Sequence, residues 1–308
     1  MTAPRSVRRG FAFLSFAGIA WGTTGAAVDV IYQSSDLGPM AISFWRFLAG
    51  AALLMPVWAL RRSRGTRRTP RPVGRRVLLL AGTGVGLAVF QTAYFAAVQD
   101  TGLAVGTIVT LGAAPVFTAA GGRVFLGEHI GRGGLLAVAG ALVGLTVLVL
   151  GNQPGVVRPL GVGMALLSAG GYAVSNVLGR WTGRHGAGED PFTLTVWSFL
   201  IGAAVMVPLA RAEGLVPHSA RPAEVALLML YIAAVTTALA YPLYFAGVAA
   251  LRAATASVVM LLEPVSAAVL AVVFLDERLT AATVTGTVVL LAAVAGLAVT
   301  ESRLDAVT

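Results

Sequence analysis

The sequence predicts an all-α integral membrane protein of ten transmembrane helices, arranged as two inverted five-helix repeats. Composition is the first reason, since the 308 residues are 57% hydrophobic and only 11% charged, against about 25% charged in a typical soluble domain. The mean hydropathy is +0.84. Apolar runs of about 20 residues, long enough to cross a bilayer, follow one another along the whole chain. The third reason is an internal repeat.

Two pairs of segments carry this repeat. Ala104–Ile130 and Ala253–Leu279, at an offset of 149, are identical at 9 of 27 positions. Ser43–Pro56 and Thr195–Pro208, at an offset of 152, are identical at 7 of 14. Duplicated hydrophobic units are typical of transporters built from two halves.

We therefore divide the chain into a first repeat, 1–152, and a second, 153–308. The predicted spans of the first repeat are 11–32, 39–60, 77–98, 103–126 and 133–151. The first span follows three arginines but exceeds the 7–15-residue core of a signal peptide, so we expect it to be retained. The second span begins with Pro39, the third follows an arginine-rich connector, and the fourth contains Pro115.

The predicted spans of the second repeat are 160–179, 191–211, 224–247, 252–275 and 281–300. Asp190 and Pro191 predict an N-cap followed by proline at the first helical position. Small residues four apart, such as Gly18 and Gly22 or Gly82 and Gly86, predict close helix packing.

The arginines predict the orientation. Of the 22 basic residues, all Arg, 17 fall in the connectors that lie inside if both termini are cytoplasmic or at the inner ends of the adjoining spans, including the block Arg61–Arg76. This bias favours cytoplasmic termini in a bacterial inner membrane, with the block against anionic lipid headgroups. Five crossings in each repeat then invert the second half. We expect no nucleic-acid partner, because no folded polar domain accompanies the arginines.

Enzymatic chemistry is not expected. The chain has no Cys and no Lys, which excludes a thiol nucleophile and a Walker lysine. His129, His185 and His218 fall in connectors without metal-ligand spacing. We therefore predict neither a metal nor another cofactor.

Charged residues within spans are costly and therefore informative. Glu263 lies near the middle of the ninth span, beside Pro264, which weakens the helix and frees a carbonyl. It could bind a substrate or a coupling proton, or serve packing alone. Arg46 in the second span could hold a substrate carboxylate, pair with an acid or cap a helix end. Asp29, near the outer end of the first span, is a further candidate, and Pro115 and Pro264 are candidate hinges.

Polar and aromatic side chains inside the spans predict a central cavity. Tyr94 and Tyr244 are equivalent in the repeat, and the pairs Gln91–Tyr94 and Tyr241–Tyr244 each lie on one helix face. Individually, each aromatic residue could equally pack or form an interfacial belt. The candidate lining residues are Trp21, Gln91, Tyr94, Tyr172, Asn176, Tyr241 and Tyr244.

Several motifs resemble those of the EamA-type drug/metabolite transporters, the ten-helix group of their superfamily. They are Ala20-Trp21-Gly22, Trp45-Arg46-Phe47-Leu48, Tyr94-Phe95-Ala96, and the duplicated ending Pro115…Leu126-Gly127-Glu128 and Pro264…Leu275-Asp276-Glu277. The resemblance covers nearly the whole chain. It implies efflux of a small metabolite, an amino acid-like compound or a drug.

The function we expect is a secondary carrier that exports small molecules by alternating access, with the proton as a candidate coupling ion. Uptake or exchange of a small organic solute is the alternative within the carrier class. A channel or scramblase is a further alternative, which flux that never saturates would reveal.

Overall fold

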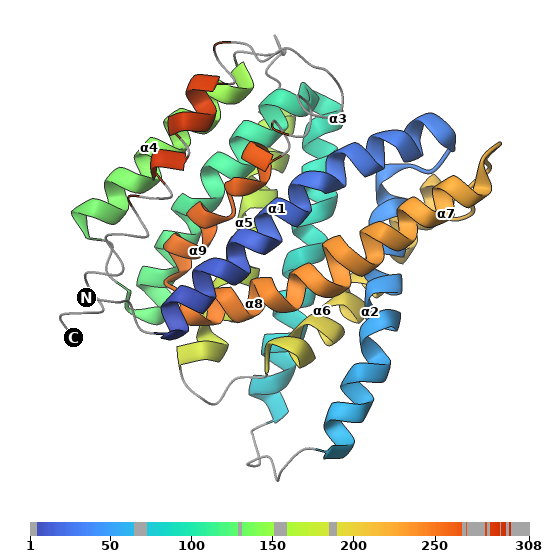
Figure 1. The fold of residues 1–308 in the computed structure, drawn as a ribbon, viewed down its shortest axis with the longest axis horizontal. Coiled ribbons are helices and arrows are strands. Elements are labelled where there is room, and N and C mark those ends of the chain that lie inside the picture. Colours follow the sequence, from blue (N-terminus) through green and yellow to red (C-terminus); the bar gives the residue numbers. More distant parts are fainter. Residues whose placement is uncertain are drawn as a thin grey trace.

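The computed structural model describes residues 5–64, 73–128, 131–150, 159–184 and 190–266, with some positions between 269 and 296. Within these ranges the chain is helical and contains no strand (Figure 1). The elements are α1 (Arg5–Ser34), α2 (Pro39–Arg64), α3 (Val73–Leu126), α4 (Arg132–Leu150), α5 (Pro159–Arg184), α6 (Pro191–Glu213), α7 (Pro222–Tyr231), η1 (Ile232–Leu239), α8 (Ala240–Ala250) and α9 (Ala253–Val259).

Seven helical segments in the described part of the chain are long and apolar enough to cross a membrane. They are Ser6–Ser34, Pro39–Leu60, Gly74–Val98, Val109–Leu126, Pro159–Trp181, Pro191–Glu213 and Pro222–Ala250. Each overlaps one predicted span, so the protein is a multi-pass helical membrane protein. The predicted fifth span corresponds to α4. The predicted span 252–275 is described at residues 252–266 and 269, and the span 281–300 at 281, 284–289, 291–293 and 296.

α3 is a single run of helical residues that folds back on itself. Eight residues along a straight α-helix span about 12 Å. A Cβ built on Gly106, however, would lie 3.2 Å from the backbone nitrogen of Val98. The chain must therefore reverse direction between these two residues, which gives α3 two arms. The arms correspond to the third and fourth predicted spans.

The segment from α7 to α8 is one continuous helix with a π-helical middle, η1. A π-helical turn contains an extra residue and presents its carbonyl groups differently from an α-helix, and such turns are frequent at functional sites. Pro222 stands at the first helical position of α7, where its missing N–H would have had no partner.

Glycines allow the closest helix approach in the bundle. α3 packs most extensively on α5. A Cβ on Gly171 would lie 2.7 Å from the carbonyl oxygen of Gly86 and 2.7 Å from the nitrogen of Phe90. The close approach that the glycine spacing predicts at Gly86 is therefore confirmed.

The predicted start of the seventh span is also confirmed. Pro191 begins α6, and the Asp190 carboxylate accepts hydrogen bonds from the backbone nitrogens of Phe192 (3.0 Å) and Thr193 (3.2 Å). α6 then packs on α2, and α1 packs on α8. The main core draws on these four helices and on α3, α5 and α9, and its fully buried side chains include Leu14, Phe47, Phe199 and Phe245.

Candidate functional site

A cluster of aromatic rings occupies the centre of this core. The ring of Trp21 from α1 lies 4.6 Å from Tyr241 and 5.2 Å from Tyr244, both on α8 (centroid distances). Tyr172 from α5 lies 6.4 Å from Tyr244. Tyr241 and Tyr244 are each only 1% exposed. Four of the predicted lining residues therefore come together, and their rings pack against one another.

Arg46 lies at the edge of this cluster. Its Nη2 donates hydrogen bonds to the hydroxyl of Tyr241 (3.2 Å) and to Oε1 of Gln91 (3.5 Å). Its Nε is buried and makes no hydrogen bond to any described residue. Arg46 thus bridges α2, α3 and α8, and its guanidinium keeps donor capacity beyond the two bonds that hold it.

Glu263 follows an interruption of the ninth predicted span. α9 ends at Val259, Met260 and Leu261 form a turn, and helical residues resume at Leu262. The Glu263 nitrogen donates to the Met260 carbonyl at 3.0 Å. This segment packs on α1, where a Cβ on Gly18 would lie 3.5 Å from the Glu263 nitrogen.

The charges of Glu263 and Arg46 act on each other and on Tyr241. The two side chains are partly buried, and neither forms an ion pair within 4 Å with a side chain in the described ranges. An acid and a base therefore share one buried region without neutralising each other by direct contact.

The two candidate hinges lie in different local structures. Pro264 is within the first turn after the interruption at Met260 and Leu261. Because Pro264 has no N–H, it cannot donate to Met260 four residues earlier, and Glu263 makes the shorter bond instead. Pro115 is buried in the second arm of α3, where the helical run is uninterrupted.

The remaining candidates lie around this centre. Tyr94 connects to Tyr172 through Phe90, with ring distances of 6.5 Å and 5.3 Å. Asn176 is fully buried one helical turn after Tyr172. Asp29 belongs to α1, but its side chain lies outside the described residues.

Two phenylalanines of the cluster were missed by sequence reasoning. The rings of Phe47 and Phe199 stack at 5.1 Å and 11°, and both meet Tyr241, at 6.3 Å and 4.8 Å. The repeat offset of 152 relates Phe47 to Phe199, so a signal for this pair was present in the sequence.

Thr236 was also missed. Its carbonyl, within η1, accepts a hydrogen bond of 2.7 Å from Nε1 of Trp21. The apolar sequence of η1 gives no sign of a π-helix, so this contact had no signal in the sequence. The bond ties the ring cluster to the irregular turn that precedes Tyr241.

The contact between α2 and α6 is reciprocal. A Cβ on Gly50 would lie 3.3 Å from Cε2 of Phe199, and one on Gly202 would lie 3.0 Å from Cδ2 of Phe47. Gly50 and Gly202 are equivalent in the repeat, as are the two phenylalanines. A contact of this kind, in which each partner presents the same patch to the other, is characteristic of a two-fold axis.

A separate pocket of about 410 Å³ lies between α2 and α7. It is lined mainly by apolar side chains, including Trp45, Leu53 and Leu230, and by none of the predicted site residues.

In the described part of the chain, no three His, Asp or Glu side chains gather closely enough to hold a metal ion. The arrangement of Arg46, Glu263 and the rings is suited to holding a small solute that has polar or charged ends and an apolar body.

Comparisons with known proteins agree with this architecture. The profile of the EamA-like transporter family matches twice, at residues 8–150 and 159–299. The transporter YwfM of Bacillus subtilis, whose function is uncharacterized, is 28% identical over 272 residues, which cover 87% of this chain and 86% of that protein. The uncharacterized inner membrane transporter YicL of Salmonella typhimurium is 23% identical over 94% of this chain and 95% of its own.

A crystal structure of another protein has the same fold. It superposes with a TM-score of 0.74 and 20% sequence identity over 95% of this chain and 98% of its own.

Proposed function

Because this chain belongs to the EamA-like transporter family, we propose that it is a secondary carrier that exports small metabolites, amino acid-like compounds or drugs. It does so across a bacterial inner membrane by alternating access, with both termini in the cytoplasm. The single observation that carries the proposal is the hydrogen bond of Arg46 to Tyr241 in the buried aromatic cluster, with Glu263 near enough for its charge to act on both.

The chemistry of this region supports a small amphipathic substrate. Arg46 can bind a carboxylate through the donors that its two hydrogen bonds leave free. The Glu263 carboxylate can accept from an ammonium group, and the rings of Trp21, Tyr241 and Tyr244 offer apolar and cation–π surface. A solute with both charges would complete the pairing that the two side chains do not make with each other.

Ten spans in two inverted halves, 1–152 and 153–308, complete the proposed architecture. The two matches to the family profile support a duplication. The reciprocal contact of Phe47 and Phe199 supports a two-fold relation between the halves. With five crossings in each half, that axis lies in the membrane plane. Pro115 and Pro264 are the proposed hinges of the first and second half.

Glu263 is the proposed coupling group. Near the middle of the membrane a charged carboxylate is poorly solvated, so it can take a proton in one facing state and release it in the other. Uptake or exchange would use the same residues. The direction of the gradient that drives net flux distinguishes uptake and exchange from export.

The test uses the substrate found by comparing metabolites inside and outside cells with and without the gene. In proteoliposomes with a pH gradient, we expect Glu263→Gln to abolish uphill transport, because Gln keeps the shape and hydrogen bonding but cannot titrate. Substrate binding and the amount of inserted protein should be retained. Glu224→Gln, at an exposed acid on α7, is the control and should transport normally. Uphill transport by Glu263→Gln with unchanged pH dependence would make Glu263 structural, and Asp29 would then be tested next.

A further inference from the structure

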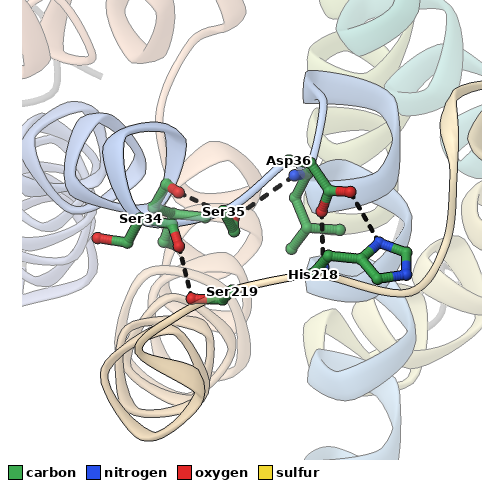
Figure 2. Close-up of polar contacts among 7 residues, drawn as sticks. Ser34, Ser35, Asp36, His218 and Ser219 are labelled. Carbon is green, nitrogen blue, oxygen red and sulfur yellow. Dashed lines mark hydrogen bonds and ion pairs between the residues drawn. The ribbon is translucent and has the colours of Figure 1, made fainter.

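A set of polar contacts joins the two halves at one end of the bundle (Figure 2). The backbone nitrogen of His218 donates to Oδ1 of Asp36 at 2.6 Å, and Nδ1 of His218 lies 2.8 Å from Oδ2 of Asp36. The hydroxyl of Ser219 donates to the carbonyl of Ser34 at 2.5 Å. These contacts connect the loop between α1 and α2 to the connector between α6 and α7.

Two further bonds extend this set into the helices. Oε2 of Glu213, at the end of α6, accepts from the backbone nitrogen of Ala41 in the first turn of α2 at 2.7 Å. Nε1 of Trp45 donates to the carbonyl of Leu215 at 2.7 Å. We call the contacts of residues 34–45 with residues 213–219 the clasp.

The clasp connects the two matches to the family profile, since its first side lies in 8–150 and its second in 159–299. The clasp is also connected to the candidate site through α1 and α2, which carry Trp21 and Arg46. At about 1.5 Å per residue, Trp21 is about 20 Å from Ser34 along α1. Arg46 is about 10 Å from Pro39 along α2. On the other side, the connector continues into α7 and η1, which carries Thr236.

The contact of Asp36 with His218 in the clasp can be broken at low cost. The side chains of His218 and Asp36 are 83% and 57% exposed, and exposed ion pairs stabilise a structure only weakly. At the other end of the bundle, Arg180 and Glu128 form an ion pair of 3.0 Å whose side chains are 16% and 11% exposed. Arg180 also donates to the carbonyl of Ala249 at 2.8 Å. Both ends are therefore held by contacts between the halves, and the clasp is the more accessible of the two.

We propose that the clasp is the gate that separates the Trp21–Tyr241–Tyr244 cluster from the water on its side of the membrane. In the described structure the gate is closed. It opens when the loop between α1 and α2 separates from the connector between α6 and α7, which moves the ends of α1 and α2 away from α7. The gate rests on the proposed carrier function, because a carrier must expose its site alternately to the two sides of the membrane.

Thr24 provides a reporter for this movement. It lies on α1 between Trp21 and the clasp, and its hydroxyl oxygen is buried with no hydrogen-bond partner among the described residues. On the side of Thr24 away from the clasp, the rings of Trp21, Tyr241 and Tyr244 pack against one another. Since the chain contains no cysteine, Thr24→Cys introduces a single thiol. A charged, water-soluble maleimide then labels the purified full-length protein, and mass spectrometry of the α1 peptide measures the rate.

In the first experiment, a disulfide locks the gate. Asp36→Cys and His218→Cys are combined with Thr24→Cys. The nitrogen of Asp36 lies 3.4 Å from the carbonyl oxygen of His218, so the backbones are close enough for a disulfide. We expect the oxidised protein to label at Thr24→Cys at least about tenfold more slowly than the same protein after reduction. Equal rates, within about twofold, would overturn the gate.

The second experiment weakens the gate without a cross-link. Asp36→Asn with Glu213→Gln removes both carboxylate charges from the clasp, and we expect labelling of Thr24→Cys to become about fivefold faster, because charge-assisted bonds are lost at both positions. Glu224→Gln is the matched control, since it removes an exposed ion pair with Arg221 that lies entirely on one side. If Glu224→Gln accelerates labelling as much as the double variant does, or if the double variant has no effect, the clasp is not a gate.

Neither labelling experiment needs a substrate. If labelling follows the clasp while no solute is moved in the proteoliposome assay, the proposed carrier function fails, although the clasp still controls access to Thr24→Cys. If transport is measured but labelling ignores the clasp, the gate fails and the carrier function stands.

Discussion

At the scale of single residues, acids from one helix cap the N-terminus of another. The first turn of a helix has backbone N–H groups with no partner in the helix. Ala41 in α2 donates to Glu213, and Gly161 in α5 donates to Asp100, each at 2.7 Å. Gly38, which precedes α2, has no side chain to supply a cap. The carboxylate from α6 therefore supplies the partner that the local sequence lacks.

Gly38→Ala tests this arrangement. A Cβ on Gly38 would overlap Cδ of Glu213, so the carboxylate must leave the nitrogen of Ala41. We expect the variant to lose about 1–2 kcal/mol of stability, the usual size of a lost cap. Thermal unfolding in detergent measures it. Gly25→Ala is the control, because nothing lies within 4 Å of its Cβ. A Gly38→Ala protein as stable as Gly25→Ala would contradict the cap.

Asp36 gives the protein a defined response to acid. Its pKa is lowered, chiefly by the backbone N–H of His218 and then by the imidazole of the same residue. A lowered folded-state pKa means that the contact contributes stability above the ordinary range of an Asp, near pH 4. That stability is lost as the pH falls through the lowered value.

We therefore expect the unfolding temperature of the natural protein to fall more steeply between pH 5 and pH 3 than that of Asp36→Asn. Thermal scans across this range measure the difference between the two proteins. Parallel curves would show that the contact with His218 does not persist in solution.

At the scale of elements, the fold depends on how closely α3 approaches α5. Hydrocarbon lipid gives helices no hydrophobic reason to associate, so close van der Waals packing through small residues takes that role. Gly171 meets the backbone of α3 directly, whereas its neighbour Gly170 has nothing within 4 Å of its Cβ position. The two glycines face different surroundings although they are adjacent in sequence.

Gly171→Ala should therefore separate the two helices. We expect a loss of about 2 kcal/mol or more, as for other overpacked contacts, and a fall in the yield of folded protein. Gly170→Ala serves as the control and should be neutral or slightly stabilising. Fluorescence-detected size exclusion after heating compares the two variants, and equal behaviour would contradict the described packing.

At the scale of the whole molecule, orientation is the property that remains to be measured. The arginine distribution predicts that a reporter active only in the cytoplasm works when fused after Arg76 or Thr308 and fails after Asn152. The ratio of activity to protein amount is the measurement. A silent fusion after Thr308 would mean an odd number of crossings, and the inverted-repeat architecture would then be wrong.

Much of this architecture could be predicted from the sequence, because a bilayer demands long apolar helices and tolerates few alternatives. Apolar runs and repeat offsets predicted the seven described spans, and they placed Trp21, Tyr172, Tyr241 and Tyr244 among the residues expected around one central cavity. They did not predict η1, since a π-helical turn depends on packing rather than on residue type. Nor did they predict the pairing of Asp36 with His218, because the two residues are 182 positions apart and neither belongs to a motif.

The fold-back of α3 between Val98 and Gly106 bears on how the chain enters the membrane. Between its two arms there is almost no polar segment that could pause in water on the far side of the bilayer. We therefore expect the first arm, although long enough to cross a membrane alone, to settle only when the second has been synthesised and turned back along it. The two arms would leave the translocation machinery as one hairpin, and a tag inserted after Thr101 should block biogenesis outright, whereas one in the arginine-rich connector before α3 should be tolerated.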